Sequence, residues 1–390
     1  MSAQIHSLGC RLNISEAEEM RAMLSAADNL VVVNSCAVTS EAVRQTRQTI
    51  RRARRANPDA RLLVTGCAAE VEREMIAAMP EVDGLVANDA KLDPRSWNVP
   101  VAFERPVPRY SRAFVQVQNG CDHACAFCVI PQGRGASRSL PVADVLREVE
   151  RQLSLGLREV VLTGVDLTSW GGDLPDTPKL GALCEAILAE FPGLPRLRLS
   201  SIDGAEIDDA LFALLAHEPR MMPHVHLSLQ SGDDLILKRM KRRHSRSDAV
   251  RLVERLRRHR PDLGLGADLI AGFPTEDRAM HANNVSIIVE LGIVHGHVFP
   301  YSARPGTPAG RMPRVDPALV KERAAELREA VAQERSRWLK GHLGTPLAVL
   351  AETDGTGHAE NFAPVRLPDG THAGEIVTVT PRQIVDGALV

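Results

Sequence analysis

The sequence predicts an α/β protein with three parts: a doubly wound parallel domain, a partial (β/α)6 barrel and a small all-β domain. Strand-like and helix-like segments alternate through residues 1–100, and then six more times through residues 110–339. This alternation is the order that parallel sheets require. Residues 340–390 hold short apolar runs separated by turn sequences, as in a small β barrel. A length of 390 residues, 44% of them apolar, is typical of a globular protein of several domains.

Three cysteines end the three strand-like segments of residues 1–100. The strands are expected at IHSLGC, LVVVNSC and RLLVTGC, which end at Cys10, Cys36 and Cys67, with helices over 13–27 and 40–56 between them. In a parallel sheet, ligands bind beyond the carboxyl ends of the strands. We therefore expect this edge to bring the three cysteines together.

The proline-bearing residues 98–111 indicate a linker to the second domain. Barrel strands are expected near 113–118, 158–164, 196–201, 224–230, 266–272 and 296–302, and helices near 141–154, 179–191, 206–216, 248–259, 283–292 and 317–340. Six such units are too few for a complete eight-stranded barrel. The sequence therefore predicts an open or partial one.

One face of several barrel strands is polar. Its members are Gln116, Gln118, His224, His226, Ser228, Gln230 and Asp268, whereas the alternating Val225, Leu227 and Leu229 are expected to face the helices. A barrel filled by its own side chains has an interior of Val, Ile and Leu. The polar face therefore indicates a lumen that holds a ligand. In the last domain, strands are expected within 344–352, 362–367 and 374–381, with turns at 354–357 and 368–370.

Composition excludes several classes of protein. Lys and Arg total 47 against 49 Asp and Glu, a net charge of −2, which excludes a uniformly basic protein. The first residues lack the cationic and apolar regions of a secretory signal, and no apolar run is long enough to span a membrane. We expect a cytoplasmic protein without a membrane partner. Its seven cysteines would then stay reduced and serve metal binding or catalysis rather than disulfides.

The most specific motif is NGCDHACAFCVIP, which directly follows the first expected barrel strand. It places Cys121, Cys125 and Cys128 at C-x3-C-x2-C spacing. Thiolates select zinc, copper(I) or iron–sulfur clusters. A structural zinc site needs four ligands, and His123 could supply the fourth. A 4Fe–4S cluster held by only three cysteines would leave one iron open to a small molecule.

With Phe127 before its last cysteine, this motif resembles the signature of the radical S-adenosylmethionine enzymes. The resemblance implies a 4Fe–4S cluster on Cys121, Cys125 and Cys128, whose open iron chelates S-adenosylmethionine. In that superfamily, electron transfer from the cluster cleaves the cofactor to a 5′-deoxyadenosyl radical, which abstracts a hydrogen atom. The protein holds the reacting groups in line and excludes water.

Along nearly its whole length the chain resembles the methylthiotransferases of that superfamily. The motifs that carry the resemblance are GCRLNISE, VVVNSCAVT, TGCAAE, LTGVDLTSWG, LRLSSIDGAEID, HLSLQSGDD, DLIAGFPTE and FPYSARPGTPA. It implies that Cys10, Cys36 and Cys67 hold a second 4Fe–4S cluster, which carries or delivers the sulfur, and that the last domain is a TRAM domain. Buried packing is the alternative for these cysteines, and we expect it for Cys184, which lies among apolar residues of a helix.

The resemblance also implies contacts to S-adenosylmethionine at the strand ends. Besides Phe127, these residues are Thr163, Gly164 and Asp166 after the second barrel strand, Ser200, Ser201 and Asp203 after the third, and Ala271 and Gly272 near the adenine. The Gly-Gly-Glu motif of the superfamily is absent from the second strand, although Gly171, Gly172 and Asp173 follow nearby. A role in turns is the alternative for each residue.

Three substrates compete within the methylthiotransferases: N6-threonylcarbamoyladenosine or isopentenyladenosine 3′ of the tRNA anticodon, and an aspartate of a ribosomal protein. The motifs around Cys10 and Cys36, and LTGVDLTSWG, resemble the threonylcarbamoyladenosine subfamily. The chain would then methylthiolate C2 of that base in the tRNA anticodon stem-loop, with an electron donor and a sulfur source as further partners.

The distribution of basic residues supports RNA binding. Two basic stretches are expected to bind phosphates: Arg44, Arg47, Arg51, Arg54 and Arg55 on one helix, and Lys241, Arg242 and Arg243 in a second run. A solvated basic face is the alternative. Residues 341–390 carry 2 basic and 6 acidic side chains, which would suit a basic ribosomal protein better than RNA. An RNA-binding module with structural zinc is a further alternative.

Overall fold

The computed structural model describes residues 3–98 and 110–390, so most of the predicted linker at 98–111 lies outside the described residues. The chain forms two compact units: Met1–Pro108, Asn119–Arg138 and Ser302–Arg311 make unit 1, and Arg109–Gln118, Ser139–Tyr301 and Met312–Val390 make unit 2. The division into three domains stays a prediction. Among the described residues, no helix has both the length and the apolar character needed to cross a bilayer.

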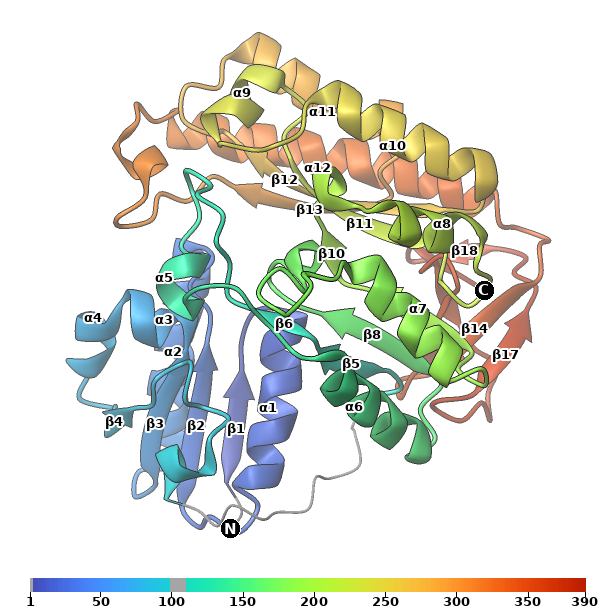
Figure 1. The fold of residues 1–390 in the computed structure, drawn as a ribbon. Helices are drawn as coiled ribbons and strands as arrows, with labels where there is room; N and C mark the ends of the chain where they lie inside the picture. Colours follow the sequence, from blue (N-terminus) through green and yellow to red (C-terminus); the bar gives the residue numbers. More distant parts are fainter. Residues whose placement is uncertain (1–2, 99–109) are drawn as a thin grey trace. The chain divides into compact units, whose positions relative to one another are not determined.

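Unit 1 contains the predicted parallel sheet, whose strands follow the order β1-β2-β3-β4 (Figure 1). The elements are β1 Gln4–Ser7, α1 Arg11–Met23, β2 Leu30–Ser35, α2 Ser40–Ala56, β3 Arg61–Gly66, α3 Cys67–Val71, α4 Arg73–Ala77, β4 Gly84–Leu85 and a 3-10 helix over Pro94–Trp97. Met20 of α1 packs with Val32 on one face of the sheet. Ile50 of α2 packs with Val31 on the other, so helices cover both faces as predicted.

Two further segments belong to unit 1. The cysteine-bearing loop lies between β6 Gln118–Asn119 and β7 Arg138–Ser139 and contains α5 Ile130–Arg134. The segment Ser302–Arg311 ends in a 3-10 helix over Pro308–Arg311. The Ala309 amide donates a 2.8 Å hydrogen bond to the carbonyl of Ala126, which ties this segment to the cysteine loop.

Unit 2 contains the six predicted barrel strands in two parallel sheets, β5-β8-β9 and β10-β11-β12-β13. The elements are β5 Ala113–Gln116, α6 Val142–Ser154, β8 Glu159–Thr163, α7 Leu180–Glu190, β9 Arg196–Leu199, β10 Ser201–Ile202, α8 Asp209–His217, β11 His224–Gln230, α9 Asp234–Arg239, α10 Arg246–His259, β12 Gly264–Ala271, α11 Arg278–Leu291, β13 His295–Pro300 and α12 Pro317–Lys340, with 3-10 turns over Leu167–Ser169 and Gly204–Glu206. The third barrel strand is interrupted at Ser200, so β9 and β10 join the two sheets.

The barrel strands bury one face against the helices. Val225, Leu227 and Leu229 pack in the same core cluster as residues of the surrounding helices, as predicted. Cys184 is also fully buried in this cluster, as predicted, and its burial raises the pKa of the thiol. The alternating polar side chains of β11 and β12 therefore form the inner face of the barrel.

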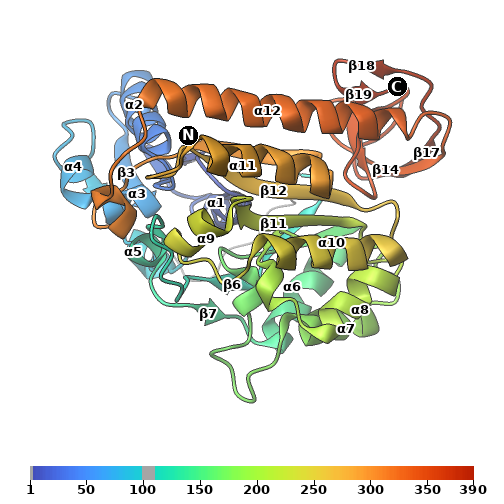
Figure 2. The ribbon, with the colours of Figure 1, turned by 90° about the horizontal axis from the view of Figure 1, so that it is seen from above.

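The last residues form a six-stranded sheet of order β17-β14-β15-β16-β19-β18. Its strands are β14 Leu347–Ala351, β15 Thr356–Ala359, β16 Pro364–Arg366, β17 Ile376–Val379, β18 Ile384–Val385 and β19 Ala388–Leu389. Figure 2 shows α12 running beside α11 and leading into this sheet. The predicted turn at 354–357 is wrong in its last two residues, because Thr356 and Gly357 already belong to β15.

The C-terminal sheet is anchored on the barrel strands through buried arginines. Arg196 donates a 2.9 Å hydrogen bond to the Ala348 carbonyl, and Arg198 donates one of 3.1 Å to the Glu360 carbonyl. The fully buried Glu159 accepts hydrogen bonds from Arg198 at 3.0 Å and from Arg112 at 2.8 Å. Burial alone would raise the pKa of Glu159, but these cations lower it to about 2. The carboxylate therefore stays charged and orients the arginines.

Candidate functional site

The first three cysteines of unit 1, Cys10, Cys36 and Cys67, lie where the strands of its sheet end. Cys10 directly precedes α1, Cys36 follows β2, and Cys67 begins α3. Gly9 has a φ of +102°, and a Cβ there would lie 2.9 Å from Sγ of Cys36, so only glycine permits this approach. Burial raises the pKa of Cys36 to about 11, and the charges of Cys67 and Cys10 add to the rise. Cys10 and Cys67 thus lie close enough to disfavour the ionisation of Cys36, and such a group of thiols suits a site whose charge a cation neutralises.

A buried charge network lies beside these cysteines. Arg134 donates hydrogen bonds to Glu16 at 2.8 and 3.2 Å and to Oδ1 of Asn13 at 2.5 Å. Lys91 donates to the same Glu16 at 2.5 Å. Two cations therefore share one carboxylate, and all three side chains are at most 1% exposed. Burial raises the pKa of Cys67 above its ordinary value, although the charges of Arg134 and Lys91 lower it. The two cations therefore offset part of the cost of ionising this buried thiol.

This network was not predicted from the sequence, although one feature of α1 indicates part of it. Leu12, Glu16 and Met20 follow one another at four-residue spacing on α1, and all are buried. A carboxylate on the buried face of a helix requires a buried partner. That signal pointed to Glu16, but Lys91 and Arg134 are 75 and 118 residues away in sequence, and no local pattern identifies them.

The loop of the second cysteine triad packs against the first triad within unit 1. A Cβ at Gly133 of α5 would lie 3.2 Å from Cβ of Cys67. The Asn88 side chain donates a 2.5 Å hydrogen bond to the Gly133 carbonyl, and its nitrogen lies 3.9 Å from Sγ of Cys67. The small residue at position 133 therefore lets α5 approach Cys67 closely.

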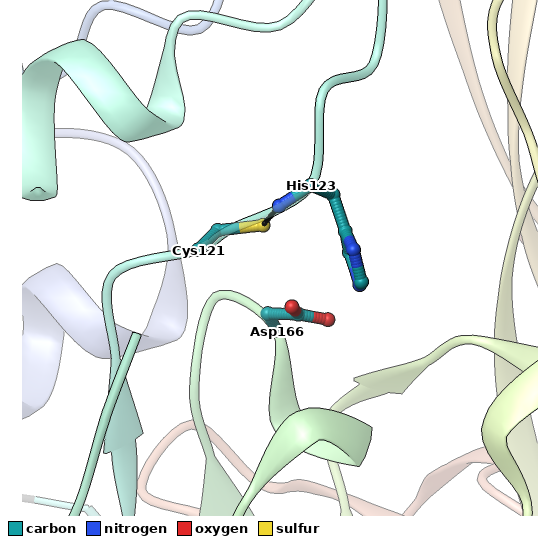
Figure 3. A group of neighbouring side chains, drawn as sticks. All are labelled: Cys121, His123 and Asp166. Atoms are coloured by element: carbon teal, nitrogen blue, oxygen red, sulfur yellow. Dashed lines mark hydrogen bonds between the residues drawn. The ribbon is translucent and has the colours of Figure 1, made fainter. Parts of the chain in front are cut away.

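Cys121, Cys125 and Cys128 lie within this loop, and backbone amides reach their sulfur atoms. The His123 amide donates to Sγ of Cys121 at 3.5 Å, as Figure 3 shows. The Ile130 amide donates to Sγ of Cys128 at 3.4 Å. Such hydrogen bonds stabilise thiolates. Cys121 is buried, whereas Cys125 and Cys128 are partly exposed, as is Phe127. The three thiols and the amides that reach them fit an iron–sulfur cluster.

The residues predicted to contact S-adenosylmethionine after the second barrel strand lie in unit 2. Thr163 ends β8 and is buried. A Cβ at Gly164 would lie 2.7 Å from Oε1 of Gln118, and the same oxygen accepts a 2.9 Å hydrogen bond from the Asp166 amide. The carboxylate of Asp166 accepts a 2.8 Å hydrogen bond from Ser169. Gln118, on the predicted polar face, therefore shapes this turn.

The other residues predicted to contact S-adenosylmethionine, after the third and fifth barrel strands, are buried in or contact other parts of unit 2. Ser200 is buried at the break between β9 and β10, and Ser201 begins β10. Asp203 accepts hydrogen bonds from Arg242 at 2.9 Å and Arg243 at 3.2 Å. A Cβ at Gly272 would lie 2.5 Å from Cγ2 of Val320 on α12. Packing against α12 thus requires glycine there, and the predicted approach to adenine stays a prediction.

The predicted RNA-binding residues divide into exposed and engaged groups. Arg44, Arg51 and Arg55 are exposed on α2, and Arg47 is partly exposed. Arg54 donates to the carbonyls of Ala60 and Glu81 and to Asp83. In unit 2, Lys241 is exposed, whereas the side chain of Arg242 is 7% exposed. Arg243 is exposed but donates to Asp203 and Glu206. Arg54, Arg242 and Arg243 thus hold the fold locally, and phosphate contact is more accessible to Lys241 and the exposed arginines of α2.

A histidine–carboxylate cluster occupies the inner face of unit 2. Oδ1 of Asp268 lies 3.1 Å from Nε2 of His226 and 3.2 Å from Nδ1 of His297. Burial raises the pKa of Asp268, but hydrogen bonds from the two histidines hold it well below its ordinary range. His226 and Asp268 were predicted from the sequence as polar inner residues, whereas His297 was not.

Two family models match the chain: the Radical SAM superfamily over residues 115–283 and the Uncharacterized protein family UPF0004 over residues 2–87. The first match implies a 4Fe–4S cluster and S-adenosylmethionine as cofactors. Among solved structures, the radical S-adenosylmethionine methyltransferase TsrM from Kitasatospora setae, with cobalamin and a [4Fe-4S] cluster bound, has a TM-score of 0.52 at 17% identity. The alignment covers 72% of this chain and 65% of that chain, which confirms the fold.

Two curated relatives match over most of their length. The threonylcarbamoyladenosine tRNA methylthiotransferase MtaB of Rickettsia prowazekii (strain Madrid E) is 44% identical, covering 96% of this chain and 93% of that protein. The tRNA-2-methylthio-N(6)-dimethylallyladenosine synthase of Paracoccus denitrificans (strain Pd 1222) is 33% identical, covering 90% of this chain and 86% of that protein. The chain described here therefore belongs to the radical S-adenosylmethionine methylthiotransferases.

Proposed function

We propose that this enzyme is a threonylcarbamoyladenosine tRNA methylthiotransferase. It replaces the C2–H of N6-threonylcarbamoyladenosine, 3′ of the tRNA anticodon, with C2–S–CH3. The observation that carries this proposal is the 44% identity, over nearly the whole chain, to the Rickettsia protein of that name. The relative named for dimethylallyladenosine is 33% identical, so the isopentenyl substrate is the second candidate.

In this proposal the two cysteine triads have different tasks. Cys121, Cys125 and Cys128 hold a 4Fe–4S cluster, and the resemblance assigns the open iron to S-adenosylmethionine. The amides of His123 and Ile130 support this set of thiolates. When bound, the cluster supplies the electron that cleaves the cofactor to a carbon radical. The residues of the loop orient the thiolates and limit the access of water.

Cys10, Cys36 and Cys67 hold a second 4Fe–4S cluster that carries the sulfur. Their convergence at the strand ends and the cations of Arg134 and Lys91 support this assignment, because an iron–sulfur cluster with three thiolates is anionic. The packing of Gly133 against Cys67 keeps both triads in one compact unit. Transfer of sulfur between groups held on neighbouring loops requires such fixed positioning.

The partners follow from the reaction. The enzyme binds the anticodon stem-loop, and the exposed arginines of α2 offer contacts to phosphates. The chemistry that the clusters would supply calls for an electron donor and a sulfur source as further partners. These partners are found in the cytoplasm, where we place the enzyme.

Nucleoside analysis tests the proposal directly. The protein is reconstituted anaerobically and incubated with S-adenosylmethionine, a reductant, sulfide and tRNA that carries threonylcarbamoyladenosine. Mass spectrometry should find the 2-methylthio product, and the protein should contain about eight irons. A matched reaction uses tRNA that carries isopentenyladenosine, and another uses ribosomal proteins. Product only in one of these would assign a different substrate, and a colourless protein with stoichiometric zinc would contradict the redox chemistry.

A further inference from the structure

Strand β13 presents two exposed side chains on the inner face of unit 2. The side chain of His297 is 59% exposed, and Phe299 is 37% exposed. They are two residues apart on one strand, so they share a face. Their ring centroids are 6.4 Å apart in an edge-to-face arrangement. Val298 between them packs on the opposite side, against the core cluster. An exposed aromatic ring beside a polar ring is the arrangement on which proteins stack and read single bases.

The imidazole of His297 has a fixed orientation. Its Nδ1 lies 3.2 Å from Oδ1 of Asp268, and the same oxygen lies 3.1 Å from Nε2 of His226. A carboxylate accepts hydrogen bonds, so both imidazoles donate to it. With Nδ1–H directed at Asp268, Nε2 is the ring nitrogen that His297 offers to a ligand. His226 is only 6% exposed and serves as the second support of the carboxylate.

The preceding inner-facing residues, His224 on β11 and His295 on β13, are covered by aromatic side chains of Phe362 and Trp338. The ring of Phe362 lies 4.9 Å from that of His224 and 5.8 Å from that of His295. Trp338 covers His295 from a third side, at 5.3 Å. Above these covered side chains, the next two inner-facing residues of β13, His297 and then Phe299, are exposed. Ligands of such barrels enter from the carboxyl ends of the strands, toward which Phe299 lies.

We propose that Phe299 and His297 form the subsite for the modified base, in which Phe299 stacks on the adenine and His297, oriented by Asp268, hydrogen-bonds its N6 substituent. This inference rests on the proposed function and names the residues that select its substrate. With Nδ1–H donating to Asp268, Nε2 of His297 accepts a hydrogen bond. A threonylcarbamoyl group offers hydroxyl O–H and carbamoyl N–H donors, whereas an isopentenyl group carries none. An apolar substituent would bury the imidazole nitrogen without a partner, and such sites reject the analogue that lacks the polar group.

The experiment compares three otherwise identical tRNAs that carry threonylcarbamoyladenosine, isopentenyladenosine or unmodified adenosine beside the anticodon. The reconstituted holoenzyme is the wild type, His297→Ala, His297→Gln, Phe299→Ala, Phe299→Tyr or the control His259→Ala, whose residue is exposed on α10. The dissociation constant and the amount of methylthio product are measured for each combination of enzyme and tRNA. Iron and zinc contents show whether each variant retains its clusters.

The two residues should differ in their effects. Phe299→Ala should weaken binding of all three tRNAs by about tenfold, because a ring stacks on any base, and Phe299→Tyr should restore it. His297→Ala should lower the preference for the threonylcarbamoyl tRNA over the unmodified one by about tenfold, without weakening binding of the unmodified tRNA. His297→Gln should restore part of the preference, and His259→Ala should match the wild type.

Several outcomes would overturn the inference. If the wild type prefers the threonylcarbamoyl tRNA and His297→Ala keeps that preference, the subsite is elsewhere while the proposed function stands. If the wild type prefers isopentenyl tRNA, both the function and the subsite are wrong. If His297→Ala weakens all three tRNAs equally, or removes one equivalent of zinc, His297 supports structure or holds a metal with His226 and Asp268 instead.

Discussion

The guanidinium of Arg134 donates two hydrogen bonds to the carboxylate of Glu16, at 2.8 and 3.2 Å, and both side chains are buried. Arg134 ends α5, six residues after Cys128, whereas Glu16 faces inward from α1, six residues after Cys10. One ion pair therefore links the loops of the two cysteine triads within unit 1. With Lys91 added, the buried network has two positive charges and one negative charge. This excess of positive charge complements the anionic cluster that we propose on Cys10, Cys36 and Cys67.

Substitutions in this network should shift the reduction potential of the proposed second cluster in opposite directions. Arg134→Met removes a positive charge and should lower the potential, whereas Glu16→Gln removes a negative charge and should raise it. A unit charge about 8 Å away at an effective dielectric constant of about 20 contributes roughly 2 kcal/mol, or on the order of 100 mV for one electron. A redox titration followed by electron paramagnetic resonance, in a Cys125→Ala background, measures the second cluster alone.

The control for these potentials is Arg44→Met, which removes an exposed arginine of α2. It should leave the potential unchanged and the iron content at about four per chain in the same background. A shift of the same sign in Arg134→Met and Glu16→Gln would show a general disturbance of the site. In that case the electrostatic role of the network would be wrong.

The two cysteine triads should separate two activities. Cys125→Ala should abolish both cleavage of S-adenosylmethionine and methylthiolation, because the open iron that binds the cofactor is lost. Cys36→Ala should retain reductive cleavage while methylthiolation falls below detection, because sulfur can no longer be delivered. Chromatography of 5′-deoxyadenosine and of the tRNA nucleosides measures both products in one reaction. Cys184→Ala, in the barrel core, serves as a comparison that should retain both activities, and equal loss of both activities in Cys36→Ala, with its first cluster intact, would count against this division.

Much of the fold could be predicted because its signals are local. The helix at 40–56 agrees with α2 to the residue, since the Thr39 hydroxyl accepts from the Ala42 amide at its start and apolar and basic positions follow at helical spacing. The break at Ser200 was missed because a single residue interrupts an otherwise continuous strand pattern. Helix α9 was missed because its six residues are too few to show a period.

The candidate site was predictable only where topology fixed it. Strand ends meet at one edge of a parallel sheet, so the sequence indicated that Cys10, Cys36 and Cys67 would converge. Partners remote in sequence could not be found in this way: Phe362 reaches His224 from a domain more than a hundred residues away. Periodicity also cannot tell a basic side chain that meets phosphate from Arg242, which is held by Asp203.

Two glycines of β12 should be required for packing at the floor of the barrel. A Cβ at Gly266 would overlap Nδ1 of His226, and a Cβ at Gly264 would overlap the carbonyl oxygen of Asn361. Alanine at either position should lower the free energy of unfolding by about 1–3 kcal/mol, the usual effect of overpacking. Chemical denaturation of each variant measures the change. Gly193→Ala is the control, because no atom lies within 4 Å of a Cβ at that position, and a similar loss there would contradict the packing argument.

Glu159 should stabilise unit 2 through its charge. Its pKa is about 2 in the folded chain against 4.5 for the ordinary group. Because the folded pKa is the lower one, the stabilisation is complete above pH 4.5 and is lost as the pH falls from 4.5 toward 2. Glu159→Gln leaves Arg112, Arg196 and Arg198 without their buried carboxylate and should cost about 3–5 kcal/mol.

Urea denaturation of the wild type and Glu159→Gln between pH 8 and pH 5.5 measures this difference. It should be constant across that range, since the carboxylate stays ionised throughout. The control Glu322→Gln, at an exposed position of α12, should match the wild type. Glu159→Gln should also expose Trp338 to fluorescence quenching at lower urea than the wild type, because Arg198 no longer holds the Glu360 carbonyl in place. A difference that already shrinks between pH 8 and pH 6 would mean that Glu159 titrates near neutrality, and the lowered pKa would be wrong.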